Sequence, residues 1–329
     1  MKKNNNNREY ETIQNWPLFF LGLIVIAFVS VLLWVSGSKV GAIFAFPACL
    51  SVASKAIFGI SDREWSLRAL VMTLIWFGVP LLIALVVAVL RRTGWASRKI
   101  QRREATRTDL RRELLASLRT IVVFSVLSVP MVWAFRNGWL QSRPGTVSPL
   151  GFALYLGAIL VAHDAWFYWT HRAMHTPLLY RSFHRFHHLT ITPTPWTAYS
   201  FAIPEAATMF LFMPFYSALV ATPQPVLFAF LALMILRNAM GHAGLELHPR
   251  GWASHPLLKW ISTTTHHDMH HGTSYTHNYG FYFTWWDKLM GTEHPDYVAT
   301  FDRVTGRVTA PAAAPGLPGA PIAPTQPLG

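Results

Sequence analysis

Residues 163–188 read HDAWFYWTHRAMHTPLLYRSFHRFHH, and this stretch decides what kind of protein the chain encodes. It holds two groups of closely spaced histidines, HRAMH and HRFHH, and a third group, HDMHH, follows at 267–271. Residues three or four positions apart lie on one face of an α-helix, so each group directs its imidazole rings toward a common point. The spacing therefore predicts metal ligands carried on helices.

The three groups supply eight histidines, and a ninth follows an apolar run in the motif GHAG at 241–244. One metal ion takes about four to six ligands, so this number fits two ions better than one. Neutral imidazole suits iron, zinc, copper or nickel, and the chain's one cysteine, Cys49, argues against thiolate or iron–sulfur sites. The histidines that the spacing predicts as ligands are His171, His175, His184, His187, His188, His267, His270 and His271, and whether His242 is a ninth stays open.

The composition predicts an integral membrane protein. Of the 329 residues, 52% are hydrophobic and only 13% are charged, about half the average of roughly 25% for soluble proteins. The net charge of +13 lies largely beside apolar runs. The preference of cytoplasmic loops for lysine and arginine explains that charge more simply than nucleic-acid binding does, and we expect no nucleic-acid partner.

The longest apolar runs predict the membrane spans, because about twenty apolar residues cross a bilayer as a helix. The predicted spans cover 16–35, 68–90, 119–136 and 149–170, with a hairpin over 203–241 that breaks at 221–225. Residues 39–60 contain Lys55 and Pro47 and fit either a further span or a re-entrant segment. A signal peptide at 16–35 is the alternative for the first run, but no small-residue cleavage site follows it.

A strongly basic segment fixes the expected topology. Residues 91–119 contain ten Lys or Arg against three Asp or Glu, which favours the cytoplasm, although a solvated helical face explains the same charges. With this segment in the cytoplasm, the following spans bring every histidine group to the same cytoplasmic face. The predicted fold is an all-α, multi-pass integral membrane protein, a transmembrane helical bundle with a cytosolic, histidine-rich metal-binding cap.

The same features predict the domain organisation. A polar segment at 1–15 precedes an N-terminal membrane region at 16–118, and the histidine-rich catalytic domain covers 119–295. The segment 310–329 is rich in Pro, Ala and Gly and has too few core-forming residues to fold.

Several polar residues are candidates for supporting the ligands. Asp164 lies seven residues before His171, close to the same helix face, so its carboxylate either accepts a ligand's second N–H or serves helix packing. Glu205 and Glu246 are further candidates, because a carboxylate near a membrane is costly unless it is paired or bound to metal. His266 adjoins the third group and His277 follows it, and both are weaker candidates.

Two other sets of side chains have open roles. His163 lies eight residues before His171, about 12 Å deeper along an ideal helix, and we expect it in the core or in support of a ligand. Trp196 and Tyr199 fit either a substrate path or an aromatic belt at the membrane interface.

Taken together, these stretches resemble the sterol desaturase/fatty acid hydroxylase superfamily of membrane di-iron oxygenases. The resemblance covers about 150–293, nearly half of the chain. The matching elements are HDAWFYWTHRAMH (163–175), LLYRSFHRFHHLTITPTPW (178–196), IPE (203–205), GHAGLE (241–246), HHDMHHG (266–272), NYG (278–280) and WWDKLMGT (285–292).

The resemblance implies a helical fold whose cytosolic cap holds two irons on the nine histidines. It implies hydroxylation or desaturation of a lipid with O2 and two electrons. Glu246 stands where the family often has another ligand, which leaves a tenth ligand in doubt. The segment from Asn278 to Gly280, with Trp286 and Asp287, either holds the last histidine group or forms ordinary turns.

The electron donor implied by the resemblance is a separate protein. Neither a haem motif HPGG nor a dinucleotide motif GxGxxG after a strand pattern is visible in the chain. The expected donor is a ferredoxin, a cytochrome b5-like protein or a reductase.

Two alternatives stay open. Ether-lipid cleavage on the same centre is one, and a non-catalytic or structural membrane metal-binding protein is the other. A transporter is disfavoured because the middle of the predicted spans is nearly free of ionisable residues, which a transport path needs.

Overall fold

The computed structural model describes residues 78–143, 145–272 and 274–306. The expected polar segment 1–15, the apolar runs at 16–35 and 39–60, Cys49 and the segment 310–329 lie outside the described residues. Of the expected span at 68–90, the described part forms a helix over Gly78–Leu90. The chain divides into two compact units, Met1–Leu81 and Leu82–Gly329. All nine predicted ligands lie in the second unit.

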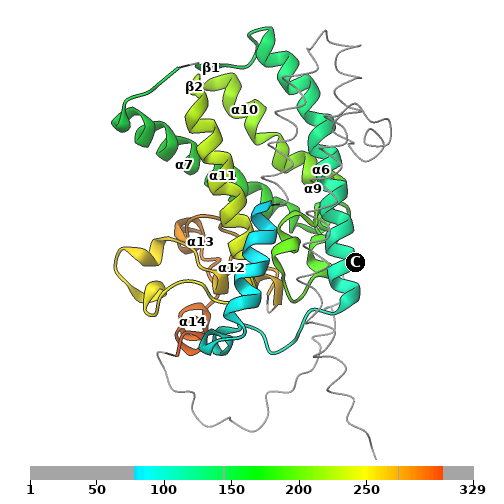
Figure 1. Ribbon diagram of the computed structural model, residues 1–329, viewed down its shortest axis with the longest axis vertical. Helices are drawn as coiled ribbons and strands as arrows, with labels where there is room; N and C mark the ends of the chain where they lie inside the picture. The colour runs from blue at the N-terminus through cyan, green and yellow to red at the C-terminus, as the bar shows by residue number, and fades with distance from the viewer. Residues whose placement is uncertain (1–77, 144, 273, 307–329) are drawn as a thin grey trace, which may run out of the picture. The chain divides into compact units, whose positions relative to one another are not determined.

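Three described helices are long and apolar enough to cross a membrane: α6 (Arg107–Arg136), α7 (Pro149–Met174) and α11 (Gln224–Gly241). They confirm helices at the runs expected over 119–136 and 149–170 (Figure 1). Thr106 and Asp109 form a capping box at the start of α6, and the Ser148 side chain caps α7 just before a proline in its first turn. These residues satisfy backbone N–H groups that the first helical turn leaves free.

The expected hairpin over 203–241 is present with an irregular first arm. It consists of α9 (Ile203–Phe210), α10 (Phe212–Leu219) and α11, and the break predicted at 221–225 falls where α10 ends and α11 begins. There β2 (Thr222–Pro223) pairs in parallel with β1 (Ser142–Arg143) from the connection between α6 and α7. This two-residue pair is a small departure from the all-α prediction.

Shorter elements surround the ends of the long helices. In chain order these are η1 (Gly94–Arg98), α8 (Pro177–Phe183), η2 (His187–Leu189), η3 (Pro195–Tyr199), η4 (Trp252–Ser254), η5 (Leu258–Trp260), α12 (Thr264–Gly272), α13 (Trp285–Leu289) and α14 (Tyr297–Val304). Helix α11 packs on α7, η3 and α12, while α6 packs on η3 and α9. Figure 1 shows α12, α13 and α14 gathered in the lower half of the view, where α11 ends.

The histidines and the basic half of α6 lie at the same end of this bundle. His171 is in the last turn of α7, and His242 caps the C-terminus of α11. The first turns of α6 reach the same region, because Thr190 donates a hydrogen bond to Glu113 and Ser117 donates one to the carbonyl of Trp196. The basic segment and the histidine groups therefore share one end, as the topology predicts.

The apolar core lies farther along the long helices. Its buried residues include Ile159 on α7, Phe212 on α10 and Phe230 on α11. His163 lies among these side chains, with its ring 4.7 Å from that of Phe212, which confirms its expected place in the core. Trp196 and Tyr199 are both buried in η3 rather than exposed at a lipid interface, so the structure does not support the aromatic belt.

Candidate metal centre

The nine predicted ligands come together as two adjacent groups. One group contains His171, His175, His184, His188 and His270, and the other contains His187, His242, His267 and His271. Within each group, one ring nitrogen from every residue lies within 4.8 Å of the others. The groups adjoin, because the ring centroids of His188 in the first group and His271 in the second lie 4.7 Å apart.

Sequence spacing sorts the histidines between the groups. Residues four apart join the same group, as His184 does with His188 and His267 does with His271. The residue at the fourth position of each HxxHH motif, His187 or His270, joins the other group. Each HxxHH motif therefore contributes to both groups, which is why the two groups lie side by side.

The second motif departs from the helix expected for it. Helix α8 ends at Phe183, His184 is its C-cap, and His187 and His188 belong to the short 3-10 segment η2. A turn connects them, and the His188 N–H still donates to the His184 carbonyl at 3.3 Å. The ligand spacing of a helix is thus kept without a continuous helix.

Most of the rings form a hydrogen bond to a backbone carbonyl through Nδ1, while Nε2 is the nitrogen that faces the other histidines. Five Nδ1 atoms lie within hydrogen-bond distance of such a carbonyl, at 2.6 to 3.4 Å. The pairs are His171 with Tyr279, His187 with Ser200, His242 with Asn238, His270 with His277, and His271 with Thr190. A carbonyl oxygen only accepts, so each of these Nδ1 atoms carries the proton, and the neutral ring presents a bare Nε2.

The bare nitrogens converge at short distances. The Nε2 atoms of His187 and His242 lie 3.4 Å apart, and those of His242 and His267 lie 2.9 Å apart. Two nitrogen lone pairs that face each other repel, and a cation between them removes that repulsion. The arrangement therefore fits metal ions held by neutral imidazoles, which suits iron, zinc, copper or nickel.

Burial keeps these rings neutral. It is the largest cause that lowers the pKa of His242 to about 4, and that of His270 and His271 well below the ordinary value. Neighbouring histidines add to the effect on His270, because positive charge on one ring disfavours it on the next. Neutral rings are ready to bind a cation without first losing a proton.

The His184 ring contacts a side-chain carboxylate rather than a backbone carbonyl. Glu205 on α9 is buried, and its Oε1 atom lies 2.7 Å from Nδ1 of His184. A carboxylate in this position fixes the ring orientation and raises the basicity of the other nitrogen, as in many metal sites.

The two other candidate carboxylates hold backbone instead of ligand rings. Asp164 accepts hydrogen bonds from the N–H groups of Tyr282 and Phe283. Glu246 accepts from the N–H and hydroxyl of Thr265, at 2.7 and 2.6 Å, and so holds the first turn of α12. Burial alone raises the pKa of Glu246, but hydrogen bonds from His248 and Thr265 outweigh it and bring the pKa below its usual value.

The NYG segment, Asn278 to Gly280, contacts two of the three histidine motifs. Asp287 accepts hydrogen bonds from the N–H groups of Tyr279 and Gly280, and the Tyr279 carbonyl in turn accepts from His171. Asn278 adopts a left-handed backbone conformation, with φ of 59°, and its amide donates to the His266 carbonyl on α12. The segment thus links the first histidine motif to the third.

Neither His266 nor His277 places its ring in the two groups. His266 is fully buried, and its ring packs at 5.0 Å on that of Tyr297. The His277 ring lies against Ser274, while its carbonyl accepts the hydrogen bond from His270. His277 therefore contributes through its backbone, a role that its side-chain identity does not reveal.

Two supporting residues come from the chain well before the first histidine motif. Gln101 donates to Asp268, between His267 and His270, and also to the carbonyl of Ile191. Glu113 on α6 accepts from the hydroxyl of Thr190, whose carbonyl holds His271. Both residues lie in the basic segment 91–119, and the sequence around them does not indicate a partner.

Comparison with known proteins matches the region that carries this geometry. Residues 156–292 match the family model for fatty acid hydroxylase. The chain is 31% identical over 202 residues to delta(7)-sterol 5(6)-desaturase erg3C of Aspergillus fumigatus, which covers 56% of this chain and 62% of that protein. It is 29% identical over 163 residues to lathosterol oxidase of Mus musculus, covering 49% of each chain.

A further relative is methylsterol monooxygenase erg25B of Aspergillus fumigatus, 28% identical over 179 residues, or 51% of this chain and 58% of that protein. The chain thus spans between 49% and 62% of the length of these relatives. No solved structure matches the chain significantly.

Proposed function

We propose that this protein is a membrane-bound oxygenase. The premise is that residues 156–292 form a domain of the sterol desaturase/fatty acid hydroxylase superfamily. The protein hydroxylates or desaturates a C–H bond of a lipid, using O2 and electrons from a separate protein. The observation that carries the proposal is the convergence of nine histidines, eight of them buried, into two adjoining groups of ring nitrogens. Relatives named for sterol desaturation and methylsterol oxidation support a lipid substrate.

Two irons are the proposed cofactor, one for each histidine group. The group that contains His171 offers five ring nitrogens, and the group that contains His242 offers four. When bound, the irons supply the activation of dioxygen and the oxidising power for C–H cleavage. Glu246 is not proposed as a tenth ligand, because its oxygens are already engaged by Thr265 and His248.

The protein's own contribution is to hold the rings and to exclude water. Outer hydrogen bonds to the carbonyls of Tyr279, His277 and Thr190 fix the ring planes, so little reorganisation accompanies metal binding. All nine rings except the half-buried His175 are buried. A shielded site protects a strong oxidant from side reactions with water.

We further propose that the histidine groups face the cytoplasm. The basic first half of α6 lies at the same end as the groups, since Glu113 and Ser117 contact the segment that follows the second motif. Positive residues at the end of a span favour the cytoplasmic side. A cytoplasmic centre is accessible to a soluble or membrane-bound electron donor. The lipid approaches the centre along the apolar helices α7 and α11.

Product analysis with labelled dioxygen tests this function. Iron-loaded protein in lipid nanodiscs is supplied with a reduced ferredoxin and with sterols or fatty acyl lipids under ¹⁸O2, and the lipids are analysed by mass spectrometry. We expect either incorporation of one ¹⁸O atom or loss of two hydrogens. The matched control is His255→Ala, an exposed histidine outside both groups, which should retain activity. The assay is repeated with a cytochrome b5-like protein and with a reductase as donor, and product no more abundant than in a His187→Ala variant under every condition would contradict the proposal.

A further inference from the structure

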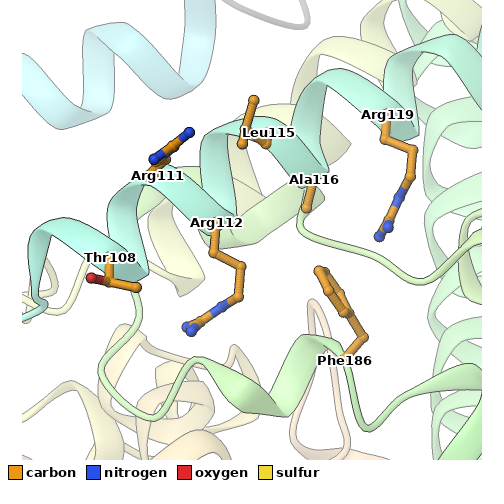
Figure 2. Close-up of a pocket in the computed structure, with 7 residues that line it drawn as sticks. All are labelled: Thr108, Arg111, Arg112, Leu115, Ala116, Arg119 and Phe186. Atoms are coloured by element: carbon orange, nitrogen blue, oxygen red, sulfur yellow. The ribbon is translucent and has the colours of Figure 1, made fainter.

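A pocket of about 370 Å³ lies between the first half of α6 and the turn of the second histidine motif (Figure 2). Three arginines line it, Arg111, Arg112 and Arg119, together with Leu115 on the same helix and Phe186 across from it. Figure 2 shows the side chains of Arg112 and Arg119 extending from α6 toward the segment that carries Phe186. None of the described residues that line the pocket is acidic.

Two of the arginines are held in place by other contacts. Arg119 lies over the Phe186 ring at 4.6 Å and donates to the Phe201 carbonyl. Arg112 pairs with Asp109 at 2.8 Å and donates to the Leu189 carbonyl. Arg111 is exposed and has no ion-pair partner among the described residues. Two fixed guanidinium groups and one free one make a preformed site for an anion with several oxygens, because guanidinium groups pair with phosphate in a fork geometry.

An apolar stripe continues from the pocket along the same face of α6. Positions 115, 122 and 126 recur at helical spacing on this face, and Leu115, Val122 and Val126 are 55%, 36% and 48% exposed. Arg119 is the last charged residue before the uncharged run 120–135. The pocket thus lies where the charged half of the helix meets its candidate membrane span.

We propose that this pocket binds the phosphate headgroup of an anionic phospholipid, whose acyl chains lie along the apolar stripe. A phosphate at the end of a span is at the depth of lipid headgroups, where each nearby Lys or Arg favours anionic lipid by about 1 kcal/mol. The stripe distinguishes a lipid from free phosphate, because it offers apolar contact that an inorganic ion cannot use. The proposal does not depend on the proposed reaction.

Phe186 connects the bound lipid to the histidine groups. It lies between His184, in one group, and His187, in the other, along the turn that carries both. A headgroup beside Phe186 and Arg119 therefore packs against the outer side of that turn. The lipid acts there as a structural ligand of the turn.

Native mass spectrometry of the detergent-purified full chain tests the proposal. The probes are phosphatidylglycerol and phosphatidylcholine with identical acyl chains, titrated against the wild type and three variants. Arg111→Gln removes one charge that has no ion-pair partner within residues 78–306 as described, and Leu115→Trp fills the pocket while keeping every arginine. Arg107→Gln is the matched control, since Arg107 is exposed at the start of α6 but does not line the pocket. Thermal melting of each variant verifies that it folds.

We expect phosphatidylglycerol to bind about tenfold more tightly than phosphatidylcholine, and Arg111→Gln to weaken it about fivefold. Leu115→Trp should abolish the preference, and Arg107→Gln should leave it intact. Equal binding of the two lipids would overturn the proposal, as would a full preference in a folded Leu115→Trp protein. Displacement of phosphatidylglycerol by inorganic phosphate at equal concentration would also overturn it, in favour of a free-phosphate site.

Discussion

The Nε2 atoms of His171 and His184 lie 2.9 Å apart, although the two residues come from different helices and different motifs. The Nδ1 atom of each ring has its own hydrogen-bond partner, which is the Tyr279 carbonyl for His171 and the Glu205 carboxylate for His184. The chain therefore fixes both rings in a position that brings their inner nitrogens together. A bound cation accounts for this contact better than any interaction between the rings themselves.

Removing the Glu205 carboxylate should weaken metal binding. Carboxylates that hold a ligand histidine typically contribute 10-fold to 100-fold to metal affinity, so we expect a loss in that range for Glu205→Ala. Glu205→Gln keeps an oxygen acceptor and should recover part of the loss. Competition with a chelator of known iron affinity measures both variants.

The matched control for that experiment is Glu293→Gln, which alters a carboxylate that pairs with Lys288 and belongs to neither histidine group. It should bind metal as the wild type does. If Glu205→Ala and Glu293→Gln hold iron equally well, Glu205 does not position His184 for metal.

Gly280→Ala should destabilise the NYG segment. A Cβ at this position would lie 2.4 Å from the Phe283 carbonyl oxygen and 2.7 Å from Oδ2 of Asp287. Overpacking of this kind costs about 1–3 kcal/mol. Because Asp287 and Tyr279 connect this segment to His171, we expect a lower melting temperature together with lower iron content.

Gly157→Ala is the comparison for Gly280→Ala, since no atom lies within 4 Å of a Cβ built at Gly157 on α7. It should leave the melting temperature unchanged or raise it slightly, because alanine favours a helix. Equal melting temperatures for the two variants would refute the tight packing at Gly280.

Deletion of residues 311–329 should leave iron content and activity unchanged. This segment is rich in Pro, Ala and Gly and lacks the apolar residues needed for a core. Activity of the truncated protein, normalised to its amount in the membrane, measures the effect. Complete loss of activity in a stably expressed truncation would show that the segment has a function that its composition does not indicate.

The sequence was sufficient to predict the long helices and the gathering of the nine histidines. Apolar runs indicate α6, α7 and α11 because such runs leave few alternatives to a helix in a bilayer. Histidine spacing indicates shared faces, and the residues four apart do fall in the same group. The division of each HxxHH motif between two groups was not predicted, because a common point was expected for each motif, whereas its middle histidine, His187 or His270, joins the other group.

The supporting contacts were not predictable from the sequence, for physical reasons. The carbonyls of Tyr279, His277 and Thr190 hold ligand rings, but every residue has a carbonyl, so no residue type marks that role. Gln101 is separated from its partner Asp268 by 167 positions in the sequence, and Glu113 from Thr190 by 77. Only folding brings such distant residues into contact. Asp164 lies at the right spacing for a ligand partner, yet its carboxylate holds the backbone of Tyr282.

Metal identity and stoichiometry test the central claim most directly. Elemental analysis of the detergent-purified protein, expressed with ample iron, should give about two irons per chain, as expected for two histidine groups. His187→Ala and His270→Ala each remove a ligand from a different group and should lower the iron content and abolish activity while the protein still inserts into the membrane. His255→Ala should match the wild type. Full iron content and activity in His187→Ala, or wild-type protein that takes up only zinc, would contradict a di-iron centre built on these histidines.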